Sequence, residues 1–488
     1  MNIAENITSR RAESWREELR QSMKNKERTS IPRVKMNELN AEYRSHNKEE
    51  VNLGLNAEQA MLEAKRCIDC PTPSCMEGCP VNINIPTFIK NVERGEFLEA
   101  AKVLKETSAL PAVCGRVCPQ EKQCEAKCIH LKMKNDPVAI GYLERFVADY
   151  ERESGNVSIP QLAPANGMKI AVVGSGPAGL SFAGDMAKMG YDVTVFEALH
   201  EIGGVLKYGI PEFRLPNKIV DVEIDVLKKM GVEFITDCIV GKTISYEDLH
   251  NDGYKGIFVA SGAGLPNFMN IPGENLIGVM SSNEYLTRVN LMDAASDDSD
   301  TPVLKGKNVA VIGGGNTAMD SVRTARRLGA ERSIIVYRRS EEEMPARIEE
   351  VKHAKEEGIE FMTLHNPLEY IGDETGQVIK MRLQKMQLGE PDASGRRRPV
   401  PIEGAIETID VDEVIVSIGV SPNPLIPQAF KGLDISRWGT IIVNEDTMRS
   451  TIDDVYAGGD IVRGGATVIL AMGDGRKAAA AMNEHLSS

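Results

Sequence analysis

The sequence predicts an α/β protein in which a helical, cysteine-rich N-terminal domain precedes two dinucleotide-binding domains of the Rossmann type. Eight of the nine cysteines lie between Cys67 and Cys128, among apolar residues at helical spacing. After Met168, short β-branched runs alternate with helical patterns, which is typical of a parallel sheet covered by helices. Two of these runs end in a glycine-rich turn, and a chain of 488 residues has room for all of these domains.

The cysteines form two groups of four, which are Cys67-x2-Cys70-x4-Cys75-x3-Cys79 and Cys114-x3-Cys118-x5-Cys124-x3-Cys128. Eight thiolates suit two 4Fe-4S clusters, although four thiolates also make a structural zinc site. Prolines follow Cys70, Cys79 and Cys118, as in ferredoxin-type runs, and no histidine lies among the cysteines. We therefore predict two 4Fe-4S clusters. The spacing does not assign each thiolate to a cluster, because ferredoxin-like runs send a ligand to the neighbouring cluster.

The first glycine-rich turn follows the strand predicted over 169–173 and contains Gly174, Gly176 and Gly179. In this GxGxxG pattern the first glycine allows the tight turn, the second lets the backbone approach a pyrophosphate, and the third lets the helix pack on the strand. The context makes this reading stronger than that of turn glycines with a purely structural role. The next strand ends at Glu197, a carboxylate that suits a ribose without a 2′-phosphate, as in FAD or NAD.

The second glycine-rich turn is a GxGxxA variant that contains Gly313, Gly315, Asn316 and Thr317. Its second strand ends in Arg338 and Arg339 instead of an acid. Guanidinium groups at that position favour a 2′-phosphate, by charge and by bidentate hydrogen bonding, so we predict NADPH here. The alternative is that the two arginines form a solvated basic edge.

The C-terminal segment carries a pattern typical of the second FAD fingerprint of two-dinucleotide flavoproteins, with Asp460 as its carboxylate. A helix predicted over 466–481 would point its N-terminus at the flavin, where it stabilises negative charge. Together with the two ribose selectors, this indicates a resident FAD and an exchangeable NADPH. The FAD domain is then discontinuous, because the NADPH domain interrupts it.

Composition changes set the predicted domain boundaries. A polar stretch over 151–167 ends the cysteine-rich part, and an acidic, turn-prone stretch over 293–302 separates the two α/β units. The predicted domains are a helical cluster domain (1–165), a first FAD-binding part (166–300), an NADPH-binding domain (301–415) and a second FAD-binding part (416–488).

Charge and hydropathy exclude several other function classes. The chain has 57 basic and 71 acidic residues, a net charge of −14, and no basic block that would neutralise a run of phosphates, so we expect no nucleic-acid partner. No apolar stretch approaches the roughly 20 residues that a membrane helix needs, and the first residues lack a signal-peptide pattern. We expect a cytoplasmic protein that does not bind membranes.

Together these motifs resemble the small (β) subunit of NADPH-dependent glutamate synthase, over residues 58–486. The stretches that carry the resemblance are 113–120 (VCGRVCPQ), 202–204, 208–211, 313–320 (GGGNTAMD), 337–339, 388–392 and 457–464 (AGGDIVRG). The same module is similar to the N-terminal part of dihydropyrimidine dehydrogenase and to the large subunit of an NADPH:ferredoxin transhydrogenase. With the resembling stretches included, the predicted FAD contacts are Gly174, Gly176, Gly179, Glu197, Gly203, Gly204, Asp460 and Thr467.

The resemblance implies that NADPH gives hydride to FAD and that single electrons then pass through two clusters to a partner. It implies one cluster on Cys67, Cys70, Cys75 and Cys128, and a second on Cys79, Cys118 and Cys124. The fourth ligand of the second cluster is either Cys114 or Glu144. The implied partner is a glutamate synthase large subunit or a ferredoxin-like acceptor, because the segment 465–473 looks closer to the transhydrogenase relatives. A zinc-stapled nucleotide binder without turnover is the alternative from another class.

Overall fold

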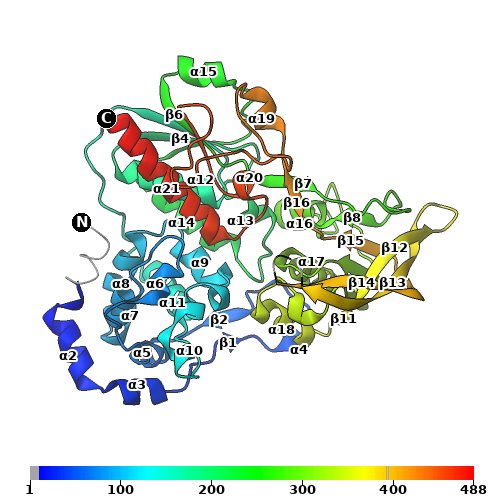
Figure 1. Cartoon of the computed structure of the whole chain (residues 1–488), viewed down its shortest axis with the longest axis horizontal. Helices are drawn as coiled ribbons and strands as arrows, with labels where there is room; N and C mark the ends of the chain where they lie inside the picture. Colours follow the sequence, from blue (N-terminus) through cyan, green and yellow to red (C-terminus); the bar gives the residue numbers. More distant parts are fainter. Residues whose placement is uncertain (1–9, 392, 394) are drawn as a thin grey trace.

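In the computed structural model, a helical domain lies below one α/β unit and beside a second one (Figure 1). The structure describes residues 10–391, 393 and 395–488. An N-terminal arm, drawn in blue, runs along the lower edge from the helical domain toward the second α/β unit. Its elements are α2 (Ser14–Ser22), α3 (Asn25–Ser30), β1 (Asn37–Glu38), α4 (Ala41–Arg44) and β2 (Asn52–Gly54).

Short helices build the cysteine-rich domain, as the sequence predicts. They are α5 (Ala57–Lys65), α6 (Ser74–Glu77), α7 (Ile85–Glu93), α8 (Phe97–Lys105), α9 (Pro111–Val117), α10 (Ile129–Lys132) and α11 (Ile140–Glu153), with single 3-10 turns at Gln120–Lys122 and Glu125–Lys127. Polar caps and prolines set where several of them begin: the Asn84 side chain accepts a hydrogen bond from the backbone N–H of Thr87, with proline in the first turn of α7. Most of the cysteines lie at the ends of these helices or in the connections between them, whereas Cys114 lies in the middle of α9.

The first α/β unit contains a five-stranded parallel sheet in the order β17-β6-β3-β4-β5. Its elements are β3 (Lys169–Val173), α12 (Pro177–Lys188), β4 (Asp192–Phe196), α13 (Val205–Tyr208), α14 (Asn217–Lys229), β5 (Glu233–Ile235), α15 (Tyr246–Asn251), β6 (Tyr254–Val259), β17 (Val455–Ala457), α20 (Asp460–Arg463) and α21 (Val468–Ser487). The C-terminal strand β17 pairs with β6, so the predicted discontinuous domain is confirmed.

The second α/β unit contains another five-stranded parallel sheet, in the order β11-β10-β9-β15-β8. Its elements are β8 (Val279–Ser281), α16 (Ser282–Leu291), β9 (Asn308–Ile312), α17 (Asn316–Arg327), β10 (Arg332–Tyr337), α18 (Ile348–Glu356), β11 (Glu360–Thr363) and β15 (Glu413–Val416), with a 3-10 turn at Glu341–Glu343. Strand β8 precedes the acidic stretch that the sequence analysis used as a boundary, so this sheet begins earlier in the chain than residue 301.

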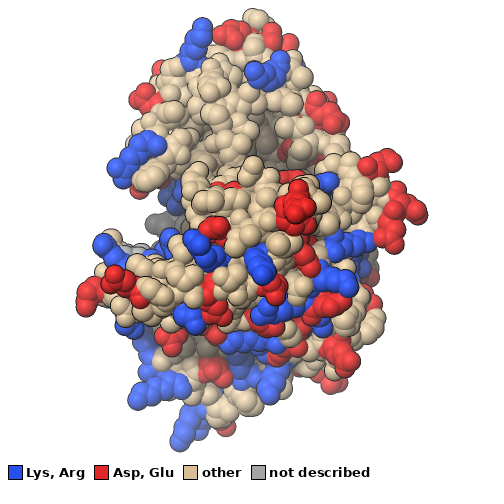
Figure 2. Space-filling model, turned by 90° about the vertical axis from the view of Figure 1, so that its right-hand side faces the viewer, with Lys and Arg blue, Asp and Glu red and all other residues tan. Residues whose placement is uncertain are grey.

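Further strands connect and extend the two units. The antiparallel strands β12 (His365–Gly372), β13 (Val378–Pro391) and β14 (Arg397–Asp410) project to the right in Figure 1. Two short connectors, β7 (Ala263–Pro266) and β16 (Val420–Pro422), pair with each other and lead to α19 (Leu425–Ala429). Figure 2 views the molecule from this end: side chains of both charges crowd the lower half, whereas the upper half is mainly uncharged.

One continuous hydrophobic core joins the helical domain to the first α/β unit. Phe88 and Leu104 of the helical domain belong to the same buried cluster as Val172, Phe182 and Met472. Burial of this apolar surface fixes the cysteine-rich domain against the first sheet, because separating the two would expose it to water. The second α/β unit has its own core, around Val311, Val322 and Ile335.

Candidate redox and nucleotide sites

Four cysteines from three segments converge on one cavity in the helical domain. Cys67, Cys70, Cys75 and Cys128 line it together with apolar side chains such as Ile85. Burial raises the pKa of the Cys67 thiol to about 11, so a metal bound here has to displace protons from the thiols. Four cysteines around one cavity fit the ligand set that a 4Fe-4S cluster requires, and they are the four that the resemblance implies for the first cluster.

The second set of cysteines lies deeper in the domain. Cys79, Cys114 and Cys118 are buried, and Cys124 is partly exposed. Burial raises the pKa of Cys79 to about 12, and the nearby charges of Glu144 and Cys118 act in the same direction. Both candidates for the fourth ligand, Cys114 and Glu144, therefore lie in this set.

Glu144 and Cys114 differ in what they contact. Burial raises the pKa of Glu144 to about 8, with the charge of Glu223 adding to the effect, and its Oε1 atom has no hydrogen-bond partner among the described residues. The Sγ atom of Cys114 lies 3.5 Å from Sδ of Met472. A buried carboxylate without a partner is costly, whereas a buried thiol packs as a small apolar group.

Helix α21 begins between this second set and the first glycine-rich turn. On one side, the Gln123 amide donates to the Thr467 hydroxyl at 3.5 Å, and Met472 contacts Cys114. On the other side, the Ser181 hydroxyl of α12 donates to the carbonyl of Met472 at 3.0 Å. The start of α21 is therefore in contact with both predicted cofactor regions.

The first glycine-rich turn has the geometry of a dinucleotide site. Gly174 adopts φ +101°, and a Cβ there would lie 2.5 Å from the carbonyl of Ala260, while a Cβ on Gly179 would lie 2.0 Å from the carbonyl of Gly174. At Gly176, a Cβ would meet no protein atom within 4 Å. The protein itself therefore does not require glycine at position 176, as expected where the backbone must leave room for a pyrophosphate.

Glu197 lies at the end of β4 and is tied to this turn. Its carboxylate accepts hydrogen bonds from the backbone N–H of Ser175 at 2.9 Å and from that of Leu199 at 2.9 Å. The Ser175 hydroxyl also accepts from the N–H of Gly203 at 2.9 Å, so Gly203 and the neighbouring Gly204 lie against the turn. Ser175 holds these predicted contacts together, a role that its variable position in the motif did not reveal.

The C-terminal fingerprint lies on the same unit. Asp460 begins α20, accepts a hydrogen bond from the N–H of Ala466 at 2.9 Å, and has its pKa raised by burial. Asp474, which the sequence analysis did not single out, is buried and accepts from the N–H of Gly459 at 3.0 Å and from Arg463. Thr467 caps α21 by accepting from the N–H of Leu470. The cap and the buried carboxylate fix the loop between α20 and α21.

The second glycine-rich turn repeats the first in its geometry. A Cβ on Gly313 would lie 2.2 Å from the carbonyl of Ser417, whereas a Cβ on Gly315 would meet nothing within 4 Å. Asn316 accepts a hydrogen bond from the N–H of Arg347 at 2.9 Å, and Thr317 is exposed at the start of α17. This open helix N-terminus fits the phosphates of a nicotinamide dinucleotide.

The two arginines after β10 are not equivalent. Arg338 is exposed, whereas Arg339 is buried and donates from Nε to the carbonyl of Arg397 at 2.9 Å. The predicted 2′-phosphate ligands are therefore one accessible side chain and one that already holds strand β14 in place.

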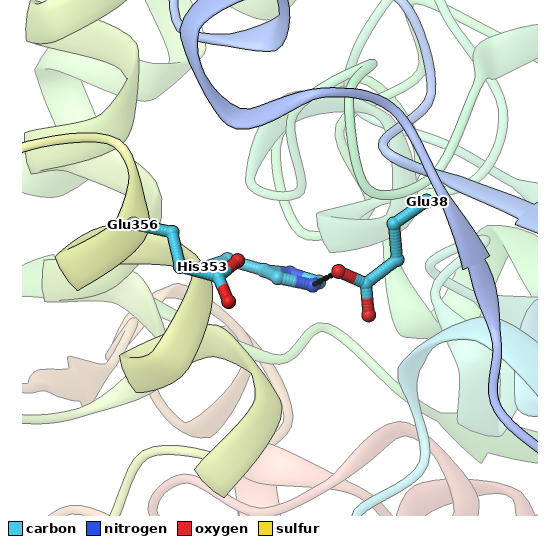
Figure 3. A group of neighbouring side chains, drawn as sticks. All are labelled: Glu38, His353 and Glu356. Carbon is cyan, nitrogen blue, oxygen red and sulfur yellow. Dashed lines mark ion pairs between the residues drawn. The ribbon is translucent and has the colours of Figure 1, made fainter.

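A group of three side chains away from these sites has the composition of a metal site. Glu38 of β1 points at His353 of α18, and Glu356 lies beside them (Figure 3). Glu38 lies 3.1 Å from Nζ of Lys352, and Glu356 lies 2.5 Å from Nη2 of Arg44. Because cations of the protein already neutralise both carboxylates, we interpret the group as an ion-paired contact that holds the arm against α18.

Comparisons with known proteins agree with these two regions. The family model of dihydropyrimidine dehydrogenase domain II, described as a 4Fe-4S cluster domain, matches residues 44–156. That of pyridine nucleotide-disulphide oxidoreductases matches residues 168–475. Among solved structures, FprA of Mycobacterium tuberculosis aligns with a TM-score of 0.55 and 20% identity, over 67% of this chain and 85% of FprA, which supports the fold of the two α/β units.

Curated relatives match across most of the chain. The glutamate synthase (NADPH) small chain of Azospirillum brasilense is 37% identical over 88% of this chain and 90% of its own length. That of Escherichia coli K12 is 36% identical over 86% and 90%. The NADPH-Fe(3+) oxidoreductase subunit beta of Geobacter sulfurreducens is 37% identical over 85% of this chain but only 64% of its own length.

A 4Fe-4S domain joined to a two-unit dinucleotide-binding flavoprotein defines an iron-sulfur pyridine-nucleotide oxidoreductase. Within that class, the chain belongs to the family of glutamate synthase (NADPH) small chains. The predicted fold class and the predicted cofactors FAD, NADPH and 4Fe-4S are confirmed at the level of these families, which disfavours the zinc alternative. The assignment of individual residues to each cofactor stays a prediction. Among the described residues, no helix is long and apolar enough to cross a membrane.

Proposed function

We propose that this chain oxidises NADPH on its second α/β unit and delivers the electrons, through FAD and two 4Fe-4S clusters, to a large glutamate synthase subunit. FAD supplies the conversion of a two-electron hydride into single electrons. The chain's own residues would bind each cofactor and fix its position relative to the next one. Arg338 and the turn at Gly315 would bind NADPH, and the turn at Gly176 would bind the FAD pyrophosphate.

The contact that carries this proposal is the start of α21. Thr467 and Met472 touch the second cysteine set through Gln123 and Cys114, and Met472 also touches α12, which begins at the first glycine-rich turn. Continuous packing between a flavin site and a cluster site is what electron transfer between them requires. The order of transfer is then flavin, second cysteine set, first cysteine set and acceptor.

We further propose Glu144 as the fourth ligand of the second cluster. Its buried Oε1 lacks a hydrogen-bond partner among the described residues, and an iron ion would satisfy it. Cys114 would instead pack as an uncharged thiol against Met472.

An anaerobic titration with NADPH, and separately with NADH, tests the function. Protein of known iron, sulfide and flavin content should show bleaching of both flavin and iron-sulfur absorbance, faster with NADPH than with NADH. Flavin that neither nucleotide reduces, or a preparation without iron-sulfur absorbance, would rule out the proposal. A reconstituted large subunit should then form glutamate from 2-oxoglutarate and glutamine at the expense of NADPH.

A second acceptor has support from the relatives. The same module occurs within chains named for other NADPH-dependent oxidoreductases, of which this chain spans less than two thirds. If a ferredoxin-like protein accepts electrons and a glutamate synthase large subunit does not, the alternative of an NADPH:ferredoxin transhydrogenase is the correct one.

A further inference from the structure

The first cysteine set is the one that lies nearest to the surface. Cys67, Cys70, Cys75 and Cys128 are all partly exposed, whereas four of the five candidate residues of the second set, all except Cys124, are buried. An acceptor that approaches from outside therefore comes closest to the first set.

An open hollow lies directly against this set. It has a volume of about 600 Å³ and shares Ile68, Cys70, Ser74 and Ile129 with the cavity that the four cysteines line. Its outer wall is the N-terminal arm, which contributes the basic side chains of Arg11, Arg20 and Lys24. The hollow thus gives a partner direct access to the cluster cavity.

Among the described residues of the hollow's wall, the single acidic side chain is already neutralised. Asp69 is buried and pairs with Arg16 and, at 2.7 Å, with Arg20. Arg11 and Lys24 therefore dominate the potential that the hollow presents to an approaching molecule.

The segment after Cys128 extends the same surface. Helix α10 begins at Ile129, which lines the hollow, and helical spacing puts Lys132 on the same side as Ile129, with Met133 directly after the helix. Met133 is 42% exposed and neighbouring Leu131 is 44% exposed. Exposed apolar side chains beside lysines are the composition of a protein interface, with an apolar centre and a polar rim.

The charge of this surface contrasts with that of the whole chain. The net charge of the chain is −14, whereas residues 10–156 are close to neutral, with 24 lysines and arginines against 23 aspartates and glutamates. The excess of acid therefore lies in the two α/β units, which repel an acidic protein, while the arm and α10 attract it. In Figure 1 this surface lies along the lower side of the helical domain, at α2, α3 and α10.

We infer that the hollow at Cys70, with the arm residues Arg11, Arg20 and Lys24 and the α10 residues Lys132 and Met133, is the docking surface for an acidic redox protein that takes electrons from the first cysteine set. We call it the Cys70 surface. The inference rests on the proposed function and adds to it where the acceptor binds and what charge the acceptor carries.

The test is a charge reversal on intact holoprotein. The variant Lys24→Glu/Lys132→Glu changes two exposed lysines of the Cys70 surface, neither of which is a predicted cofactor ligand. The control variant Lys242→Glu/Lys255→Glu makes the same change of charge on the first α/β unit. The probe is an acidic ferredoxin, assayed for binding by calorimetry at low and high salt, and for reduction with NADPH as donor.

We expect the first variant to bind the ferredoxin about tenfold or more weakly at low salt and to lose most of the salt dependence, because steering and rim charges act through long-range electrostatics. The control should bind like the unmodified protein. Both variants should retain their iron content and NADPH-dependent flavin reduction. Equal weakening in both variants, or unchanged binding in the first, would overturn the docking surface. Failure of the unmodified protein to reduce its own flavin with NADPH would instead overturn the proposed function.

Discussion

At the scale of single residues, the second cluster gives the sharpest test. Replacing Glu144 by Ala should remove about half of the iron, because one of two 4Fe-4S clusters loses a ligand, while Cys114→Ala should keep all of it. Glu144→Gln retains an oxygen donor and should retain iron, with an altered electron paramagnetic resonance signal of the reduced cluster. Iron analysis and that spectrum are the measurements. Loss of iron from Cys114→Ala together with full iron in Glu144→Ala would assign the ligand to the thiol instead.

The exposed Arg338 makes a second prediction about a single residue. Arg338→Ala should raise the KM for NADPH about tenfold or more, because a charged hydrogen bond to the 2′-phosphate contributes about 1.5–3 kcal/mol. The KM for NADH should not change, since NADH lacks that phosphate. Steady-state reduction of an artificial dye with each nucleotide gives both values.

Arg339→Ala is the informative comparison for Arg338. Arg339 is buried and donates a hydrogen bond to the carbonyl of Arg397. Its removal should therefore lower the melting temperature as well as raise the KM for NADPH. A KM that rises equally for both nucleotides in Arg338→Ala would show that Arg338 does not contact the 2′-phosphate.

At the scale of elements, local sequence patterns predicted what local geometry determines. The strand expected over 169–173 coincides with β3, and the second glycine-rich turn follows β9, because each of these strands ends in a turn whose first glycine the backbone requires. The projecting sheet β12–β14 was not predicted. Its long strands carry charged residues on exposed faces and resemble loop sequence.

Contacts between distant segments were also beyond sequence reasoning. Asp474 supports Gly459 and Arg463 across a turn, and Glu38 meets His353 from the far end of the chain. Neither pairing leaves a periodic pattern, because each depends on how whole elements pack. The cysteines were found because their spacing is itself the signal, although spacing alone did not divide them between clusters. The structure places the four that the resemblance implies for one cluster around one cavity, and their assignment as ligands stays a prediction.

The ion-paired contact between β1 and α18 predicts that the stability of the protein depends on pH. The hydrogen bond with His353 is the strongest influence on Glu38. Together with Lys352 it outweighs the opposing effect of burial and lowers the pKa of the Glu38 carboxyl from 4.5 to about 2. A carboxyl whose pKa is lower in the folded state stabilises the protein above the unfolded pKa, and this contribution is lost as the pH falls from about 4.5 toward 2. The melting temperature of Glu38→Gln should therefore lie below that of the unmodified protein from pH 8 to 5, with a difference that shrinks as the pH drops to 4.

The exposed Glu374, in the turn between β12 and β13, provides the control for that experiment. Glu374→Gln should leave the melting temperature unchanged at every pH. A difference between Glu38→Gln and the unmodified protein that stays constant down to pH 4 would mean that Glu38 does not titrate with a lowered pKa.

At the scale of the whole molecule, a buried ionic network connects the N-terminal arm, the first α/β unit and the second α/β unit. Arg214, from the first α/β unit, donates to both carboxylate oxygens of Asp320 on α17 at 2.7 and 2.6 Å. It also lies 3.2 Å from Glu350 on α18, and Arg44 of the arm lies 3.1 Å from Glu357 at the end of the same helix. The orientation of the NADPH-binding unit toward the FAD-binding unit therefore depends on a few buried charges.

Breaking this network should slow hydride transfer without removing a cofactor. Asp320→Asn leaves Arg214 buried with a weakened partner, and loss of a buried pair destabilises by about 3–5 kcal/mol. The rate of flavin reduction at saturating NADPH should fall in stopped-flow measurements, while flavin and iron contents stay the same, because the nicotinamide is no longer held against the flavin. Glu360→Gln removes an exposed pair with Arg332 in the same unit and should change stability by less than about 1 kcal/mol and the rate not at all. If Asp320→Asn lowers stability but reduces flavin at the unmodified rate, the network supports the fold, and the alignment of the two nucleotide sites must come from other contacts.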